Sequence, residues 1–480
     1  MLKKRFLLAL AALAFGTSVA ANAQTLVNLA HSASDGAETV LLLTDGRALV
    51  QGNNDADWWT LTPDINGSYV NGTWKQVASL PSGYSPYAET EAVMIDGRVI
   101  IEGGEYNFGS FAFTNQGAVY DPIANTWTMQ QPPDGWDFFG DTPSVVLPNG
   151  KFMMGRKFDM KMAELDPHTL TWTPLASTGK SDWFAEEGWT LMPNGTVVTV
   201  DVLNSPNSEH YDRDTQTWIQ DGSTQALLMG PPEVGCLSGQ WGTYCPPGEV
   251  GPQVLRPDGT LFATGALHRG EATGHTAVYT PGSGPDVPGT WVKGPDFPNG
   301  DYCDDNFAAL LTNGNVLVSS AGGSLYEFNG TTMTRTANGG GSLLVLPTGE
   351  VMVAGRQVYR SVGTYQQFWA PMLFPLSVAA IGRGATYTAY GSNFNGMSQA
   401  HGFGDEFQTA TNYPLVRLTN MATNHVFYAR THDHSSMAVR KLGSITYTRF
   451  DVPANAETGT TKMEVVTNGI PSNPITVMVF

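Results

Sequence analysis

A repeated unit constrains this 480-residue chain more than any other feature. An apolar strand, a tight turn and a second apolar strand recur seven times along the sequence. Dipeptides of the Asp-Gly and Asn-Gly type tolerate the positive φ that two-residue hairpin turns require, so each one predicts a β-hairpin. The seven turns are Asp45-Gly46, Asp96-Gly97, Asn149-Gly150, Asn194-Gly195, Asp258-Gly259, Asn313-Gly314 and Thr348-Gly349.

A second half completes the repeat and supplies two more strands. In Tyr120-Asp121-Pro122 a turn follows an apolar residue, and Trp127 lies in the next strand; the same pattern leads to Trp172 and to Trp218. A four-stranded unit cannot bury both of its faces alone, so the seven copies must close on one another. We therefore expect an all-β fold in which residues 24–368 form a seven-bladed β-propeller. A β-sandwich is the rival for many short strands, but it would not repeat this composite unit.

The two ends of the chain differ from the repeats. Lys3, Lys4 and Arg5 precede an apolar stretch, and Ala21-Asn22-Ala23 follows it, which predicts a signal peptide over residues 1–23 with cleavage after Ala23. We expect a periplasmic or secreted protein without a membrane partner, because no later segment offers about 20 consecutive apolar residues. Residues 369–480 contain roughly seven short segments with alternating strand patterns, such as Ala385 to Ser392, which predict an immunoglobulin-like β-sandwich.

Charge and cysteine content narrow the possible partners. The chain has 43 acidic and 25 basic residues and a net charge of −18, so its surface repels nucleic acid. Three cysteines allow one disulfide bond in an oxidising compartment. Cys236 and Cys245 close the shortest loop, and a bond from Cys303 to either of them is the alternative, because spacing alone does not settle the pairing.

The C-terminal segment carries short motifs that resemble a known family. These are Tyr413-Pro414-Leu415-Val416-Arg417-Leu418, Thr431-His432-Asp433-His434-Ser435-Ser436-Met437 and Asn468-Gly469-Ile470-Pro471-Ser472. Together with the signal peptide and the seven repeats, they resemble the galactose-oxidase-like Kelch-repeat family. The resemblance implies Kelch blades followed by an immunoglobulin-like domain. In the copper radical oxidases of that family, a Tyr-His pair, a Cys-crosslinked Tyr and a C-terminal His hold the metal.

Most of those copper ligands are missing from the matching positions. Gly339 and Gly340 stand where the Tyr-His pair belongs, and Ala37 stands where the crosslinking Cys belongs. Tyr87 and Ala88 occupy the position of its Tyr partner, so only His432 matches cleanly. Glycine offers no donor atom, so the sequence disfavours copper. A rearranged copper site using His31, His268 or His275 stays as an alternative.

Acidic residues precede the predicted hairpins at regular steps. In a propeller, the loops that enter the inner strands surround the axis, so residues seven to nine positions before each turn should lie around its mouth. Carboxylates at close quarters raise one another's pKa and can act as general acids and bases, or they bind a hard cation such as calcium. The acidic residues at these steps are Glu38, Glu89, Asp141, Glu186, Glu187, Glu249, Asp304 and Asp305.

From this pattern we predict the residues that act on a ligand. The candidate catalytic residues are Glu89, Asp141, Glu187, Asp305 and His432. Aromatic rings beside carboxylates suit sugars, because rings stack on apolar faces while carboxylates take hydroxyl protons. The candidate substrate-binding residues are Tyr87, Trp136, Phe139, Trp183, Phe184, Glu249 and Tyr302. The alternative for both sets is structural: carboxylates that tie neighbouring blades together and rings that pack between blades.

These observations predict an enzyme that acts by carboxylate acid/base chemistry on a neutral carbohydrate, polyol or aromatic ether. A hydrolase or a lyase fits this chemistry better than a copper radical oxidase does. One alternative is a non-catalytic glycan-binding or adhesion module, and another is a copper oxidase with altered ligands. The partner in each case is a small molecule or a glycan. The sequence assigns no metal ligand and no cofactor, with calcium as the candidate ion for the acidic mouth.

Overall fold

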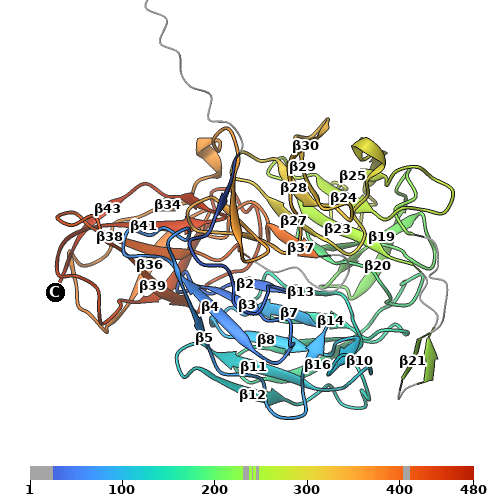
Figure 1. Cartoon of the computed structure of the whole chain (residues 1–480), viewed down its shortest axis with the longest axis horizontal. Helices are drawn as coiled ribbons and strands as arrows, with labels where there is room; N and C mark the ends of the chain where they lie inside the picture. The colour runs from blue at the N-terminus through green and yellow to red at the C-terminus, as the bar shows by residue number, and fades with distance from the viewer. Residues whose placement is uncertain (1–24, 231–236, 240–241, 245–247, 404–410) are drawn as a thin grey trace, which may run out of the picture.

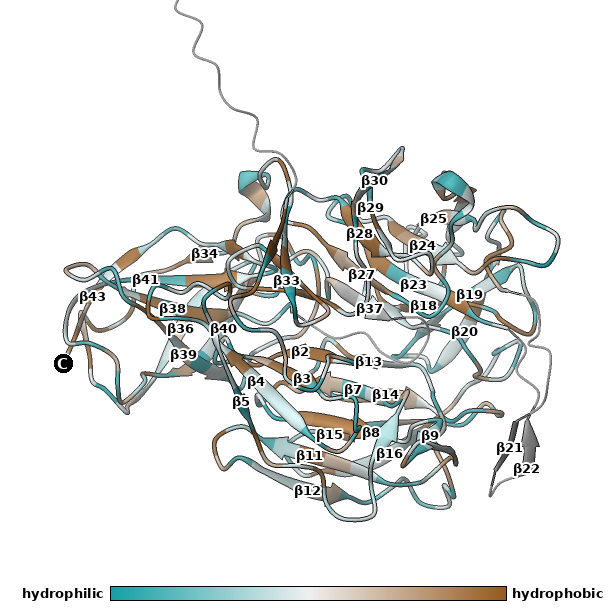
Figure 2. Cartoon of the chain, in the orientation of Figure 1, coloured by the Kyte–Doolittle hydropathy of each residue, from teal (hydrophilic) through white to brown (hydrophobic). Residues whose placement is uncertain are grey.

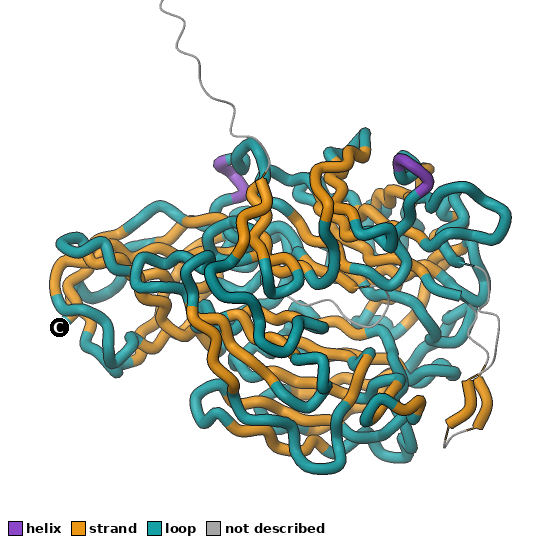
Figure 3. Tube along the Cα trace, in the orientation of Figure 1, coloured by secondary structure: helices purple, strands orange, loops and turns teal. Residues whose placement is uncertain are grey.

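The computed structural model describes residues 25–480 except 231–236, 240–241, 245–247 and 404–410. The fold is all-β, as predicted: β-strands make up almost all regular structure, and the helical elements described are the short 3-10 turns η1 (Pro298–Gly300) and η2 (Gln367–Trp369) (Figure 3). Within these residues, no helix has the length and apolar character needed to cross a membrane. The predicted signal peptide lies outside the described residues.

Seven antiparallel sheets follow one another along the chain, six with four strands and one with five, and we number them in that order. Sheet 1 contains β2 (Val40–Leu42), β3 (Ala48–Gln51), β4 (Trp58–Thr62) and β5 (Thr73–Gln76). Sheet 2 contains β7 (Thr90–Val93), β8 (Val99–Glu102), β11 (Gly117–Asp121) and β12 (Thr126–Gln130). Sheet 3 contains β13 (Ser144–Val146), β14 (Phe152–Gly155), β15 (Met162–Asp166) and β16 (Thr171–Leu175). Sheet 4 contains β17 (Thr190–Leu191), β18 (Val197–Val200), β19 (Asn207–Asp212) and β20 (Thr217–Ser223).

The last three sheets extend the pattern. Sheet 5 contains β23 (Val250–Leu255), β24 (Leu261–Gly265), β25 (Thr276–Thr280) and β26 (Thr290–Lys293). Sheet 6 contains β27 (Phe307–Leu310), β28 (Val316–Ser319), β29 (Ser324–Phe328) and β30 (Met333–Asn338). Sheet 7 contains β31 (Leu343–Val345), β32 (Val351–Val353), β33 (Gln357–Arg360) and β1 (Thr25–Asn28). Each of the seven predicted hairpins joins the first two strands of one sheet.

The first strands of the seven sheets form a closed ring. Each one contacts the first strand of the next sheet, from β2 to β31, and β31 contacts β2. The apolar residues of these strands are buried, which explains their near-continuous apolar sequence; Figure 2 shows this character in β2 and β3. The N-terminal strand β1 pairs with β33, so the two ends of this region share sheet 7.

The C-terminal segment folds as a second unit with its own core. Its nine strands are β34 (Met372–Leu373), β35 (Ala380–Ile381), β36 (Thr386–Ser392), β38 (Leu415–Asn420), β39 (Val426–His432), β40 (Ile445–Asp451), β41 (Gly459–Thr467), β42 (Ile470–Pro471) and β43 (Ile475–Val479). Val416, Phe450 and Met463 belong to the apolar cluster at its centre. Figure 1 shows this unit beside the ring, in orange and red.

One strand from the C-terminal segment lies inside the ring and is the fifth strand of sheet 6. β37 (His401–Phe403) pairs with β27 and contacts β23 and β31, which are first strands of three consecutive sheets (Figure 1). Just before it, the side-chain amide of Gln399 donates to the carbonyl oxygen of Val146 in β13, at 3.2 Å. The segment 399–403 therefore fills the centre of the ring at this level.

The two ends of the ring carry different parts of the chain. At one end, the hairpin turns contact the C-terminal unit: Thr431 N donates to Thr44 O (3.1 Å), and Met437 N donates to Pro148 O (2.9 Å). The opposite end carries the loops that lead into the first strands, and we call it the entry end. A small sheet of β6 (Pro86–Tyr87), β9 (Tyr106–Asn107) and β10 (Ser110–Phe111) forms part of the loops at this end of sheet 2. A separate hairpin joins β21 (Leu237–Gly239) to β22 (Gly242–Tyr244).

The third cysteine does not take part in a disulfide bond. Cys303 is a free, buried cysteine whose thiol lies 3.4 Å from the carbonyl oxygen of Ser319. Burial raises the pKa of this thiol well above its ordinary value. The alternative pairing through Cys303 is thus wrong, whereas Cys236 and Cys245 lie outside the described residues.

Candidate functional site

Acidic side chains from four consecutive sheets meet at the entry end. Asp141, Glu186, Glu249 and Asp305 lie in the loops before β13, β17, β23 and β27. The fully buried ammonium group of Lys157, which follows β14, donates to the carboxylates of Asp141 and Glu186. Glu249 interacts electrostatically with all four of the other groups. We call these five residues the Lys157 cluster.

Within this cluster, Glu249 is set up as a proton donor. Burial is the largest effect on its carboxyl group, and the charges of Glu186 and Asp305 act in the same direction, raising its pKa to about 12 against the opposing charge of Lys157. Glu249 is partly exposed, and the neighbouring Asp305 is exposed to solvent. A neutral carboxylic acid beside an accessible carboxyl group provides the two partners of acid/base catalysis.

The backbone at the entry end adopts an uncommon conformation. Left-handed φ values occur immediately before three of the predicted catalytic residues: 54° at Ala88, 54° at Glu186 and 60° at Asp304. Non-glycine residues rarely adopt this region, and they cluster at functional sites. These conformations set the direction of the chain as it enters Glu89, Glu187 and Asp305.

A row of aromatic rings leads from the small sheet to the Lys157 cluster. Its ring centroids are 6.0 Å apart between Tyr87 and Tyr106, 6.2 Å between Tyr106 and Phe111, and 4.9 Å between Phe111 and Phe113. Lys157 Nζ lies 5.8 Å from the centre of the Phe113 ring. Phe138 and Phe158 continue the row. Tyr87, at the outer end, has 44% of its surface exposed.

Sequence reasoning selected only Tyr87 from this aromatic row. Phe138 lies between the predicted residues Trp136 and Phe139 in the sequence but is not itself among the predicted contacts. Tyr106 and Phe111 belong to a short hairpin whose turn contains Phe108 and Gly109. A search for alternating aromatics in the long loop of the second repeat would have found them.

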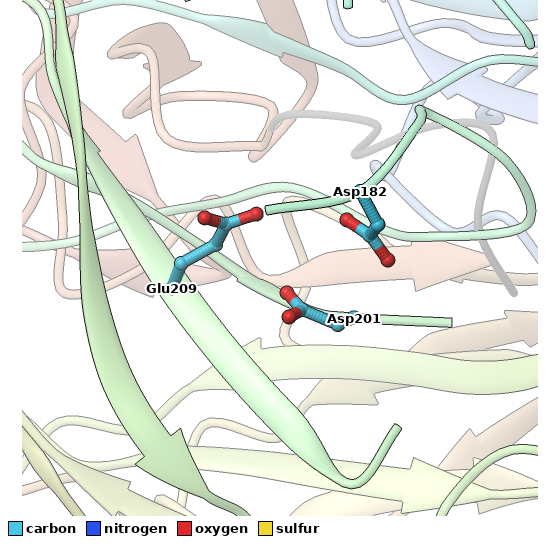
Figure 4. A group of neighbouring side chains, drawn as sticks. All are labelled: Asp182, Asp201 and Glu209. Atoms are coloured by element: carbon cyan, nitrogen blue, oxygen red, sulfur yellow. The ribbon is translucent and has the colours of Figure 1, made fainter. Parts of the chain in front are cut away.

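Glu187 belongs to a second buried group, which surrounds Lys180. Lys180 Nζ donates to Glu187 Oε2 (3.2 Å), to Glu209 Oε1 (2.6 Å) and to Asp182. Asp201 lies next to them, and Figure 4 shows its carboxylate with those of Asp182 and Glu209. We call these five residues the Lys180 cluster. All of them are buried, so the structure places Glu187 in an ion-paired network away from solvent.

Burial also governs the titration of the Lys180 cluster. It raises the pKa of Glu187 well above the ordinary value, and the charge of Lys180 opposes this effect. Burial, followed by the charges of Asp182 and Glu209, raises the pKa of Asp201 to about 7. The sequence does not predict Lys180, Asp201 and Glu209 as site residues, because they lie outside the positions seven to nine before each hairpin turn.

Glu89 lies in a third acidic group, between sheets 1 and 2. It is fully buried, and neither of its carboxyl oxygens has a hydrogen-bond partner. Its pKa is raised well above the ordinary value, mainly by burial and then by the charge of Glu91. Glu91 accepts a hydrogen bond from Thr39 Oγ1 across the two sheets, at 3.1 Å. Glu89 therefore faces a neighbouring sheet, and its catalytic role stays a prediction.

His432 lies at the opposite end of the ring from the acidic groups. It ends β39 beside Thr431, whose backbone bonds to the hairpin end of sheet 1. Its ring nitrogens lie 2.9 Å from Asp433 Oδ2 and 3.3 Å from Asp451 Oδ1. The length of the first strands separates it from Asp141 and Asp305. The structure does not bring the predicted His432 together with the predicted carboxylates.

His434 is a structural residue of the C-terminal unit. Burial lowers its pKa to about 3. Its Nδ1 lies 2.8 Å from Thr448 Oγ1, and its ring stacks on Tyr413 with centroids 6.1 Å apart.

The predicted aromatic contacts divide into buried and exposed rings. Trp136, Phe139 and Phe184 are buried: Trp136 packs on Phe139 at 5.6 Å, and Phe184 packs on Trp189 at 5.4 Å. These three rings contact other side chains and offer no open face to a ligand, which is the packing alternative. Trp183 is 53% exposed, and Tyr302 is partly exposed.

The donor set at the positions that match the copper oxidases does not fit copper. Gly339 and Gly340 precede β31 at the entry end and have no side-chain donor, as do Ala37 and Ala88. His432, the remaining match, lies at the hairpin end. Copper needs imidazole, phenolate or sulfur donors at close quarters, but Tyr87 and His432, which carry such donors, lie at opposite ends of the ring.

Comparison with known proteins finds similarity to solved structures alone, and at low sequence identity. No family model and no curated protein matches the chain. Among solved structures, the extracellular domain of BT4673 from B. thetaiotaomicron, described as a one-component system, is 13% identical with a TM-score of 0.45. That alignment covers 95% of this chain and 58% of the other chain. YjhT is 15% identical with a TM-score of 0.41, over 65% of this chain and 99% of its own.

Proposed function

We propose that this chain is an exported seven-bladed β-propeller of the Kelch type with a C-terminal immunoglobulin-like domain, and that it is an enzyme. The propeller is supported by seven consecutive sheets of four or five strands, by the closed order of their first strands, and by the pairing of β1 with β33. The residue pattern of the first 23 positions supports export to the periplasm or outside the cell.

The Lys157 cluster carries the proposal of acid/base catalysis. Glu249 is the general acid, because its raised pKa keeps it protonated at neutral pH. In a hydrolysis, Glu249 donates its proton to the bridging oxygen as the C–O bond to the leaving group breaks. Asp305 accepts a proton from water as the water oxygen forms the new bond. This division of roles between two carboxyl groups is that of a glycoside hydrolase.

A neutral substrate with hydroxyl groups suits this site best. The chain has a net charge of −18, and four carboxyl groups surround one lysine in the cluster, so an anionic substrate would be repelled. The row that begins at Tyr87 offers aromatic rings on which sugars or aromatic ethers can stack. The substrate class is therefore a neutral carbohydrate, polyol or aromatic ether.

A screen of neutral oligosaccharides, polyols and aryl ethers tests this proposal, with mass spectrometry of the products as readout. Wild type should convert at least one compound, and Glu249→Gln and Asp305→Asn should each lose that activity. Asp258→Asn is the control, because this residue lies in an exposed hairpin turn of sheet 5. Equal activity of wild type and both variants would refute the acid/base roles.

Non-catalytic glycan binding is the second candidate function. The exposed Tyr87 and the aromatic row behind it favour it, because rings alone can hold a sugar. Lys157 also neutralises part of the acidic cluster, as in a purely structural ion-pair group. Glycan binding without turnover, weakened by Tyr87→Ala and unchanged by Glu249→Gln, would support this function over catalysis.

A further inference from the structure

We propose that Asp182, Asp201 and Glu209 form a binding site for a divalent cation of the calcium type in sheet 4. One carboxylate oxygen from each residue lies within 4.8 Å of the others. Figure 4 shows the three carboxylates facing a common space between the loop of Asp182 and the strand of Glu209. The site is separate from the catalytic roles proposed for Glu249 and Asp305.

An unsatisfied oxygen gives a second, independent reason for a ligand at this place. Asp201 is fully buried, and its Oδ1 has no hydrogen-bond partner. Its other oxygen, Oδ2, accepts a hydrogen bond from Ser181 Oγ at 2.8 Å. A buried carboxylate oxygen without a partner is costly, and a bound cation removes that cost.

The charges of the Lys180 cluster also favour a cation. Lys180 is the only lysine or arginine that forms ion pairs with Asp182, Glu187, Glu209 or Asp201 in the described part of the chain. Four carboxyl groups share this single ammonium group in a buried space, and a divalent ion adds positive charge next to them. Lys180 therefore neutralises the cluster only in part.

The donor atoms select the kind of ion. All three side chains offer carboxylate oxygens, and the hydroxyl of Ser181 lies 3.3 Å from Glu209 Oε1. Oxygen ligands of this kind suit calcium, whereas zinc and copper prefer nitrogen and sulfur donors. Ser181 and Trp183, the neighbours of Asp182 in the chain, are exposed, so this loop runs along the surface above the buried carboxylates.

Terbium luminescence tests this site directly, because Tb³⁺ replaces Ca²⁺ and tryptophan sensitises its emission. The Trp218 ring lies 5.2 Å from Lys180 Nζ, and Trp189 Nε1 lies 3.3 Å from Glu187 Oε1. Chelator-treated full-length protein should show saturable emission on excitation of tryptophan, and Ca²⁺ should displace it. Asp201→Asn should weaken binding by at least ~10-fold, and Asp258→Asn should bind like wild type.

Thermal unfolding with and without Ca²⁺ provides a readout that also checks folding. Ca²⁺ should raise the midpoint of the chelator-treated wild type, because a ligand of the folded state stabilises it. It should leave the midpoints of folded Asp201→Asn and Glu209→Gln almost unchanged. Wild type without saturable Tb³⁺ emission, or Asp201→Asn with wild-type affinity, would overturn the site. Glu249→Gln should keep ion binding, so failure of this site and failure of the proposed catalysis are distinguishable.

Discussion

Glu186 and Glu187 are neighbours in the sequence, yet their carboxylates bind two different buried lysines. Glu186 pairs with Lys157, and Glu187 pairs with Lys180 at 3.2 Å. The left-handed backbone at Glu186 accompanies this divergence. The loop before β17 thus connects the acidic group at the entry end to a second acidic group within sheet 4. A change at either lysine should alter one group and spare the other.

Replacing Lys157 by methionine should strongly destabilise the protein. Asp141 and Glu186 would keep their buried carboxylates without the ammonium group, and breaking a buried ion pair in this way costs about 3–5 kcal/mol. Urea unfolding measures the loss. Lys293→Met is the matched control: Lys293 and its partner Asp296 are both exposed, so its loss should cost less than about 1 kcal/mol. Equal effects of the two changes would contradict the structural role of Lys157.

Glu249→Gln should lower kcat/KM by about 10²–10⁴-fold, because general acid catalysis contributes that much. The amide keeps the size of the side chain but cannot protonate a leaving group. Steady-state kinetics on a substrate found in the screen measures the change. A substrate with a good leaving group, such as an aryl ether of an acidic phenol, should be affected less. A rate unchanged on every substrate would rule out this role for Glu249.

The stability of the protein should fall as the pH rises from about 4.5 to 8. Burial raises the pKa of Glu91 from 4.5 to about 8, so the folded state keeps a proton that the unfolded state has already released. This advantage of the folded state is lost progressively as the pH rises from 4.5 towards 8, and above pH 8 Glu91 is charged in both states. Urea unfolding between pH 5 and pH 9 should therefore give a declining free energy of unfolding. Glu91→Gln should flatten the decline, and Glu271→Gln, at a partly exposed ion pair with His275, should not. A free energy that rises over this range would contradict the prediction.

Removal of β1 should open sheet 7. A chain that begins at Leu29 lacks the strand that pairs with β33, whereas a chain that begins at Thr25 keeps it. The shorter chain should unfold at a lower temperature than the longer one, because it loses a whole strand ladder and exposes the edge of β33. Identical unfolding of the two chains would show that β1 does not hold the ends of the ring together.

Tyr87→Ala should weaken substrate binding more than it slows turnover. Its ring is exposed and begins the aromatic row, so we expect it to contact substrate at a distance from the reacting bond. We expect KM to rise while kcat changes little. Phe138→Leu, deeper in the row, keeps apolar packing and serves as the comparison. A loss confined to kcat would place Tyr87 in the chemical step and contradict this assignment.

The strand pairs were predictable because their signals are local. Each dipeptide from Asp45-Gly46 to Thr348-Gly349 predicts a turn from two adjacent residues alone. All seven hairpins form at these turns. β37 was not predictable in the same way. It has three residues, lacks a turn signal and pairs with β27, which lies more than ninety positions earlier. Its position depends on how the C-terminal unit packs against the ring.

Spacing from the hairpin turns predicted that the acidic residues lie at the entry end of the ring, but it did not predict the direction of their side chains. Asp141, Glu249 and Asp305 do meet at the entry end, as the spacing implied. Glu89 and Glu187 lie at the same level, but their side chains are buried between or within sheets. The buried Lys157 and Lys180 carried no sequence signal, because lysine is rarely buried and then only with partners that are distant in the sequence.

We propose that the entry end catalyses a reaction, and binding and turnover of the same substrate distinguish catalysis from binding alone. Binding affinity and turnover of the same neutral substrate are measured for wild type and for Glu249→Gln, with isothermal titration calorimetry and product analysis. We predict that the variant binds the substrate with nearly wild-type affinity but turns it over at least ~100-fold more slowly. A substrate that binds to wild type at the entry end without any turnover, or that Glu249→Gln converts at the wild-type rate, would contradict the claim.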